Sequence, residues 1–256
     1  TLQMFADIVG KHLQPLVDRA REAAAEQALL GQVLDEGGPE IVVQPIIELR
    51  TGAVWAYEAL SRFPGRPGWG PQDWFAAADR VGLGVALESA AVHKALALLP
   101  RLAGGTCLTV NVSARALLAS ASIAAMLTSH AGERLVVEVT EHERIDDARR
   151  LDAVLTLARA AGVRLAVDDA GSGFAGLEHI LALSPEILKL DRALIDGIST
   201  DPARQAMCEA MVSFCRRTRT VIVAEGVETR RDLDMLRALG VTHAQGYLLG
   251  RPAPYR

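Results

Sequence analysis

Apolar and polar residues follow two different periods along this chain, and these periods predict one long helix followed by alternating strands and helices. Residues 2–34 carry apolar side chains at three- and four-residue steps, with charged residues between them. This pattern is typical of a helix with one apolar face. The stretch DEGGPE at 35–40 ends the helix. The helix either packs on the domain that follows or connects that domain to an upstream sensor domain.

Short runs of β-branched and other apolar residues follow, and they predict strands. The first two, 41–49 and 53–60, are separated by the turn RTG, which is too short for anything but an antiparallel hairpin. The later strands are expected at 107–113, 134–141, 163–169, 186–191, 220–228 and 243–249. The helices between them are expected at 71–99, 114–130, 146–161, 202–218 and 229–239.

About eight strands with helices between most of them indicate an α/β protein with a mainly parallel sheet. The count and the length fit a modified TIM (β/α)8 barrel with one antiparallel strand, preceded by an N-terminal helix. We expect the helix to occupy residues 1–36 and the barrel residues 37–256. A doubly wound open sheet is the alternative.

Composition narrows the class of partner. The chain of 256 residues has a net charge of −4, which argues against DNA or another long nucleic acid as the main partner. Its three cysteines form no C-x-x-C pair and are typical of free thiols in a reducing compartment. We see no signal peptide and no apolar run long enough to cross a membrane, so we expect a cytoplasmic protein. Because it begins with Thr1, we expect it to be a piece of a longer protein.

Carboxylates stand at or near the ends of most predicted strands. They are Glu58, Glu138, Glu141, Asp168, Asp169, Asp191, Glu225 and Glu228. The carboxyl ends of parallel barrel strands meet at one mouth, where unpaired like charges would oppose folding. Oxygen ligands without cysteine or histidine suit Mg²⁺ or Mn²⁺. The adjacent pair Asp168 and Asp169 can hold two neighbouring ions, as in sites for phosphoryl displacement.

Each of these residues has a plainer explanation when taken alone. A strand-end glutamate is often a surface ion-pair partner, Asn111 and Ser113 can cap a helix, and Lys189 with Asp191 can form a solvated pair. Their recurrence at the same end of successive strands favours one site instead. The stretch GSGFAG at 171–176 matches a dinucleotide-binding motif. However, the preceding Asp pair would repel a pyrophosphate, and the motif lies late in the chain.

Eight short motifs appear in order over residues 40–252: QPI, EALSR, NVS, EVTE, DDAGSG, KLD, AEGVE and QGY. Together they resemble the EAL domain, a bacterial family of cyclic di-GMP phosphodiesterases. The resemblance implies a modified TIM barrel and hydrolysis of cyclic di-GMP to linear pGpG with Mg²⁺ or Mn²⁺. It also implies a homodimer and, in a full-length protein, an upstream sensor or diguanylate cyclase domain.

The resemblance assigns roles to residues by their motifs. The implied ligands of one metal ion are Glu58, Asn111, Glu138 and Asp168. Asp168 and Asp169 would hold the second ion, with water-mediated help from Asp191 and Glu225. Lys189 would position or polarise the attacking water, and Glu225 is the candidate general base beside the catalytic Glu58. The implied substrate-binding residues are Gln44, Arg62, Asp191 and Gln245.

The departures from the family pattern are local. The loop after the Asp pair reads DDAGSGF, with Ala170 and Phe174 in place of the usual D-D-F-G-x-G-Y. In the family this loop links the active site to the dimer interface, so the altered residues affect the expected regulation more than the metal site. Glu141 resembles the acid that anchors this loop. Every matched ligand position is filled, which favours an active hydrolase over a silent cyclic di-GMP receptor. A different metal-dependent TIM-barrel lyase is the third class.

Overall fold

The structure is a computed structural model that describes residues 2–129, 134–140, 148–170 and 176–256. Eight strands form a closed barrel in sequence order. Strand β1 runs antiparallel to both of its neighbours, β2 and β8, and the other pairs are parallel. The strands are β1 (Glu40–Glu48), β2 (Val54–Arg62), β3 (Cys107–Asn111), β4 (Leu135–Thr140), β5 (Arg164–Ala170), β6 (Ile187–Leu190), β7 (Val221–Ala224) and β8 (His243–Ala244).

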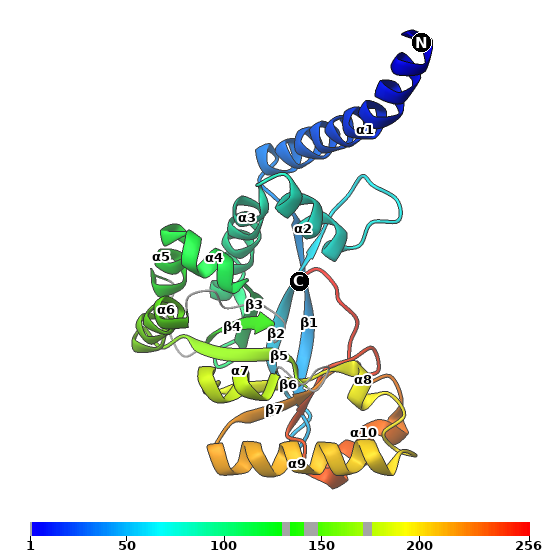
Figure 1. The fold of residues 1–256 in the computed structure, drawn as a ribbon. Helices are drawn as coiled ribbons and strands as arrows, with labels where there is room; N and C mark the ends of the chain where they lie inside the picture. Colours follow the sequence, from blue (N-terminus) through cyan, green and yellow to red (C-terminus); the bar gives the residue numbers. More distant parts are fainter. Residues whose placement is uncertain (1, 130–133, 141–147, 171–175) are drawn as a thin grey trace.

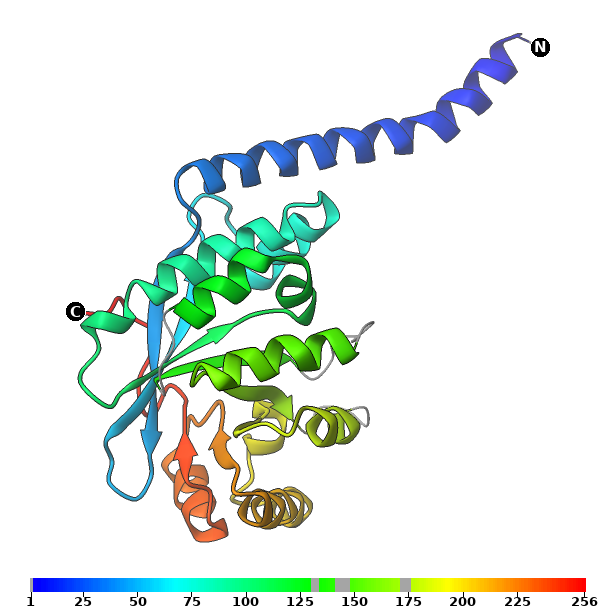
Figure 2. The same cartoon turned by 90° about the vertical axis from the view of Figure 1, so that its left-hand side faces the viewer.

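Helices surround the outside of the barrel, and α1 extends away from it (Figures 1 and 2). Barrel strands and outer helices share two large apolar cores, one towards α3–α6 and one towards α9 and α10. The helices are α1 (Leu2–Asp35), α2 (Pro71–Arg80), α3 (Gly84–Leu96), α4 (Ala114–Ala119), α5 (Ala121–Ser129), α6 (Ala148–Ala160), α7 (Gly176–Leu183), α8 (Arg192–Ile195), α9 (Pro202–Thr218) and α10 (Arg230–Leu239), with a 3₁₀ turn at Leu99–Arg101.

The predicted barrel with one antiparallel strand is confirmed, and the open sheet is wrong. The prediction of one helix over 71–99 is also wrong: the chain turns at Gly82, whose φ of 76° suits glycine, and α2 and α3 are separate. The predicted helix 114–130 divides at Ser120, whose extended backbone ends α4. The short helices α7 and α8 were not predicted, because neither is long enough to show a period.

The barrel interior has an apolar layer below a polar one. The apolar layer contains Ile46, Ala56, Cys107, Val136, Ala166, Ile187 and Val223. Side chains two positions apart lie on the same face of a strand, so Ala56 is followed inside by Glu58 and Val136 by Glu138. In the same way Ile187 is followed by Lys189. Strand periodicity therefore places the polar residues at the carboxyl mouth, above an apolar floor.

Strands β7 and β8 are shorter than the predicted 220–228 and 243–249. The chain leaves the ladder at the level of the polar layer, where Glu225 N donates to Leu190 O at 3.0 Å and Gln245 N donates to Ala224 O at 2.8 Å. Gly246 follows at a φ of 159°, and a Cβ there would lie 2.2 Å from the carbonyl oxygen of Val227. The segments that follow β7 and β8 therefore lie against each other. They could not do so if both strands continued in the ladder.

The carboxyl-terminal part of α1 packs on the barrel domain, and its amino-terminal part projects from it (Figure 2). Leu30 and Val33 are buried against Trp74 of α2. Arg80 of α2 donates to both carboxylate oxygens of Glu26, at 2.7 and 3.3 Å. Leu16, by contrast, is 58% exposed. Among the described residues, no helix combines the length and apolar character needed to cross a membrane.

Replacing Leu30 tests how α1 is held. Leu30→Ala should lower the free energy of unfolding by about 2–4 kcal/mol, because it opens a cavity beside Trp74. The matched change Leu16→Ala should cost less than about 0.5 kcal/mol, since this leucine is exposed. Chemical denaturation of both variants measures the difference. Equal effects of the two substitutions would contradict this packing.

The opposite, amino-terminal mouth of the barrel contains a buried histidine whose titration should affect stability. The His243 ring packs against Trp55 in a tilted arrangement, with a centroid distance of 4.6 Å and 52° between the ring planes, and burial lowers the pKa of His243 to about 4. The unfolded chain therefore binds a proton between about pH 6.5 and 4 that the folded protein does not. Stability from this residue should be present above pH 6.5 and lost as the pH falls towards 4.

His243→Phe, which keeps an aromatic ring against Trp55, provides the comparison. As the pH is lowered from 7 to 4.5, the free energy of unfolding of the wild type should fall relative to that of the variant. Urea denaturation at several pH values measures it. A difference that is independent of pH would show that His243 does not titrate in this way.

Candidate active site

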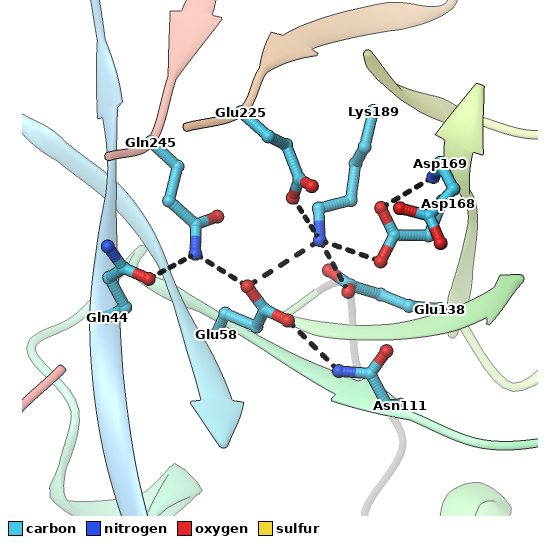
Figure 3. A network of polar contacts seen from close by, with 9 residues as sticks. All are labelled: Gln44, Glu58, Asn111, Glu138, Asp168, Asp169, Lys189, Glu225 and Gln245. Carbon is cyan, nitrogen blue, oxygen red and sulfur yellow. Dashed lines mark hydrogen bonds and ion pairs between the residues drawn. The ribbon is translucent and has the colours of Figure 1, made fainter. Parts of the chain in front are cut away.

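Lys189 of β6 lies at the centre of the polar mouth, surrounded by four carboxylates (Figure 3). Its side chain is 1% exposed. The distances from Lys189 Nζ are 2.6 Å to Glu225 Oε1, 2.7 Å to Glu138 Oε2, 3.3 Å to Asp168 Oδ2 and 3.6 Å to Glu58 Oε2. These residues come from β2, β4 and β5 and from the residue that follows β7. The barrel thus joins acids that are up to 167 positions apart in the sequence.

Amide side chains fix the orientation of Glu58. Asn111 Nδ2 donates to Glu58 Oε1 at 3.0 Å, and Gln245 Nε2 donates to Glu58 Oε2 at 2.6 Å. The same Gln245 nitrogen donates to Gln44 Oε1 at 3.0 Å. Gln44 in turn donates to the carbonyl oxygen of Gly250 at 2.9 Å. These hydrogen bonds connect β1 to β3 through the amide side chains and hold the Glu58 carboxylate in place (Figure 3).

A strand irregularity explains how two adjacent aspartates reach the same mouth. Neighbouring side chains on a regular strand point to opposite faces. The register between β5 and β6 shifts between Val167 and Ala170, and Asp169 has a φ of 58°. The Asp169 N–H donates to Asp168 Oδ1 at 2.9 Å, which stabilises this left-handed conformation. The bulge brings carboxylate oxygens of both aspartates close to Glu225.

The cluster contains more negative than positive charge. Burial raises the pKa of Glu138 to about 8, although Lys189 acts in the opposite direction. Burial, followed by Asp168 and Asp191, raises the pKa of Asp169 to about 6. Burial alone would lower the pKa of Lys189, but the surrounding carboxylates raise it well above its usual value. The carboxylates therefore keep the Lys189 ammonium group charged. They outnumber it, so this single positive charge cannot neutralise the cluster.

The donor set fits divalent cations. Oxygens of Glu58, Glu138 and Asp168 lie within 4.8 Å of one another, and so do those of Asp168, Asp169 and Glu225. Asp168 belongs to both groups. Glu138 Oε1 is buried and has no hydrogen-bond partner in the described part of the chain. Mg²⁺ or Mn²⁺ would satisfy this buried oxygen and offset the surplus negative charge.

Two cavities flank the cluster and meet at Glu58 and Leu60, which line both. The larger, of about 690 Å³, runs from Asp168 and Asp169 past Arg62 to the start of α2. The smaller, of about 250 Å³, lies on the other side, against Glu225 and Gln245. An extended ligand could thus occupy both cavities with its middle at the acidic cluster.

The structure brings most of the sequence-predicted site residues into this mouth. Arg62 lines the larger cavity, and its guanidinium also donates to Ser61 O at 2.8 Å. Asp191 lies beside the cluster, where its carboxylate accepts from Ala193 N at 2.6 Å and caps α8. Glu141, the predicted loop anchor, lies outside the described residues, as does the loop 171–175.

Other lining residues were not predicted from the sequence. Asp73 and Phe75 of α2 and Glu88 of α3 line the larger cavity, and Arg192 lines the smaller one. The helical residues lack a strand-end signal. Arg192 could have been noticed, because it directly follows Asp191 in the motif KLD.

The profile of the EAL domain family matches residues 24–252, so the chain belongs to the EAL domain family. A relative is the probable cyclic di-GMP phosphodiesterase PdeG of Escherichia coli (strain K12), 27% identical over 94% of this chain and 50% of PdeG. Another is the bifunctional diguanylate cyclase/cyclic di-GMP phosphodiesterase MucR of Pseudomonas aeruginosa, 32% identical over 88% of this chain and 34% of MucR. The chain spans half or less of the length of these relatives.

Solved structures show the same fold. A complex of the MucR phosphodiesterase with cyclic di-GMP matches with a TM-score of 0.78 and 30% identity, over 90% of this chain and 98% of that one. Klebsiella pneumoniae BlrP1, in complex with manganese and cyclic di-GMP, matches with a TM-score of 0.73 and 31% identity, over 84% of this chain and 56% of that one.

Thermal denaturation tests whether the mouth holds divalent ions. Mn²⁺ or Mg²⁺ should raise the Tm of the wild type, since a ligand at 100 times its Kd stabilises by about 2.7 kcal/mol. Asp168→Asn should remove most of this shift, because Asp168 belongs to both carboxylate groups. The exposed change Asp234→Asn on α10 is the control and should keep it. A shift of equal size in Asp168→Asn would exclude this cluster as the binding site.

Proposed function

We propose that this domain is a metal-dependent phosphodiesterase that hydrolyses cyclic di-GMP to linear pGpG. The single observation that carries the proposal is the buried cluster of Glu58, Glu138, Asp168, Lys189 and Glu225 between two cavities. The relatives named for this activity and the complexes with cyclic di-GMP support it.

We further propose which residues hold two ions, Mg²⁺ or Mn²⁺. One group is Glu58, Asn111, Glu138 and Asp168, and the other is Asp168 and Asp169, with Asp191 and Glu225 acting through water. The manganese complex of BlrP1 supports use of a divalent ion in this fold. When bound, such ions supply Lewis acidity that stabilises the attacking and leaving oxygens of a phosphoryl displacement.

The chain's own residues would orient the water and move its proton. Lys189 Nζ, fixed by Glu138 and Glu225, donates a hydrogen bond to the attacking water and stabilises negative charge that develops on the phosphate. Glu225 Oε1, which lies 2.6 Å from Lys189 Nζ, accepts the proton of that water. Gln245 and Asn111 keep Glu58 oriented by the hydrogen bonds described above.

The larger cavity would bind one phosphate and nucleoside of the substrate. Arg62, four residues after Glu58 on β2, lines it and supplies a planar donor group that suits a phosphate. Gln44 acts at the edge of the site through Gln245. Once the dinucleotide fills both cavities, their walls would exclude bulk water from the scissile bond and leave the attacking water in place.

The setting in a longer protein is also part of the proposal. Residues 1–36 would connect the catalytic barrel, 37–256, to an upstream sensor or diguanylate cyclase domain, and the domain would act as a homodimer in the cytoplasm. Two observations support this arrangement. The name of MucR combines a diguanylate cyclase with a phosphodiesterase, and Leu16 of α1 is exposed. Glu141 would anchor the loop after Asp169 in such a dimer.

Turnover of cyclic di-GMP, followed by chromatography, is the direct test. The wild type should form pGpG with Mg²⁺ or Mn²⁺ and none with a chelator. Glu58→Gln and Lys189→Met should each lower kcat by about 10²–10⁴-fold, because they remove a proposed metal ligand and the donor to the attacking water. Asp234→Asn should retain full activity.

The alternative is a receptor that binds cyclic di-GMP without cleaving it. Tight binding of the intact dinucleotide, with no product in either metal, would support the receptor and contradict the hydrolase. No binding and no product would contradict both.

A further inference from the structure

Glu88 of α3 is a buried acid in the wall of the larger cavity that the proposed reaction does not use. Its side chain is 12% exposed. Burial raises its pKa, although hydrogen bonds from Ser113 act in the opposite direction. A carboxylate in such a place costs free energy unless donors compensate it. The donors that do so show what the residue holds in place.

Both oxygens of Glu88 accept a hydrogen bond from the same residue. The Ser113 N–H donates to Glu88 Oε2 at 2.8 Å, and Ser113 Oγ donates to Glu88 Oε1 at 2.8 Å. Arg115 Nη2 lies further off, at 3.8 Å from Glu88 Oε1. Two hydrogen bonds between one pair of residues restrict the direction of the contact as well as its length. Helix α3 therefore fixes both the backbone and the side chain of Ser113.

Ser113 lies two positions after Asn111, which ends β3. Asn111 Nδ2 donates to Glu58 Oε1 at 3.0 Å, so Oδ1 is the atom with which Asn111 can bind an ion. Between the two residues, the Val112 N–H donates to the backbone oxygen of Glu138 at 3.0 Å. The turn 111–113 is thus held by β4 on one side and by α3 on the other.

Helix capping does not by itself account for a buried acid at this position. Ser113 is the N-cap of α4, and its Oγ accepts from the Ala116 N–H at 3.0 Å without help from Glu88. Ser113 is only half-buried, so water could satisfy its two donors. A buried carboxylate is a costlier acceptor than water, but it is a rigid one. Its presence favours a role in fixing the turn that carries Asn111.

We propose that Glu88 is a positioning residue of the metal site, which holds Ser113 and thereby keeps Asn111 oriented to bind a divalent ion. This inference rests on the proposed function, because Asn111 is a ligand only in the proposed site. Residues that orient metal ligands through hydrogen bonds typically change metal affinity by about 10–100-fold when they are replaced. Glu88 acts on the ion only through the turn 111–113.

Glu88→Gln tests this role by calorimetric titration with Mn²⁺ alone. The substitution replaces one acceptor oxygen with an amide NH₂, which cannot accept from either donor of Ser113. The Kd for Mn²⁺ should rise about tenfold or more, because the turn is no longer fixed. In turnover of cyclic di-GMP, the Mn²⁺ concentration for half-maximal rate should rise by a similar factor, while kcat at saturating Mn²⁺ changes much less.

Glu26→Gln on α1 is the matched control. The Glu26 side chain is 15% exposed and accepts two hydrogen bonds from Arg80 of α2, but it leads to no proposed ligand. Both substitutions should lower the Tm of the metal-free protein, whereas only Glu88→Gln should weaken Mn²⁺ binding. An equal loss of Mn²⁺ affinity in the two variants would reduce the role of Glu88 to general stability and overturn the inference.

Ser113 provides a second pair of variants, which decides the matter if Glu88→Gln does not fold. Ser113→Ala removes the hydroxyl that donates to Glu88 and should weaken Mn²⁺ binding. Ser113→Thr keeps a hydroxyl and should keep the wild-type affinity. A folded Ser113→Ala protein that binds Mn²⁺ as tightly as Ser113→Thr would contradict the proposed contact.

The two readouts separate failure of this inference from failure of the proposed function. Unchanged Mn²⁺ affinity in a folded Glu88→Gln protein would overturn the inference and leave the proposed function standing. A wild type that binds Mn²⁺ but forms no pGpG would contradict the proposed function, and weaker Mn²⁺ binding by Glu88→Gln would still support the positioning role. No Mn²⁺ binding by the wild type would contradict both.

Discussion

The burial of one lysine among several carboxylates is the constraint on which the rest of this structure depends. Lys189 is almost fully buried and has a carboxylate oxygen within 3.6 Å from each of four residues. Such a cluster costs desolvation energy, and its like charges oppose one another. It persists because eight strands hold the side chains in place above a packed apolar layer. The surplus charge then makes the mouth a place for cations.

Several local features serve this arrangement. The bulge at Asp168 and Asp169 turns two consecutive acids to one side, and the amides of Gln44, Asn111 and Gln245 fix Glu58. Strands β7 and β8 end early, which allows the segments after them to meet at Gly246. Each feature departs from regular strand geometry at the same level of the barrel. This concentration of irregular backbone is expected where a fold is adapted to bind a ligand.

Helix α2 has a second role besides packing. Its Trp74 is buried against Leu30 and Val33 of α1, whereas Asp73 and Phe75, on either side of it, line the larger cavity. The same short helix therefore contacts both the projecting α1 and the space proposed for the substrate. The chain belongs to the EAL domain family and spans half or less of the length of the relatives named above.

The sequence by itself determined the order of strands and helices, the antiparallel hairpin and the strand-end position of the acids, because these depend on local periodicity and short turns. It also identified Glu58, Glu138, Asp168 and Lys189 as residues of one mouth, since parallel strands end together. Only the tertiary structure decided the break at Gly82, the bulge at Asp169 and the pairing of Glu88 with Ser113. These depend on backbone angles and on contacts between segments far apart in the chain, which no local pattern encodes.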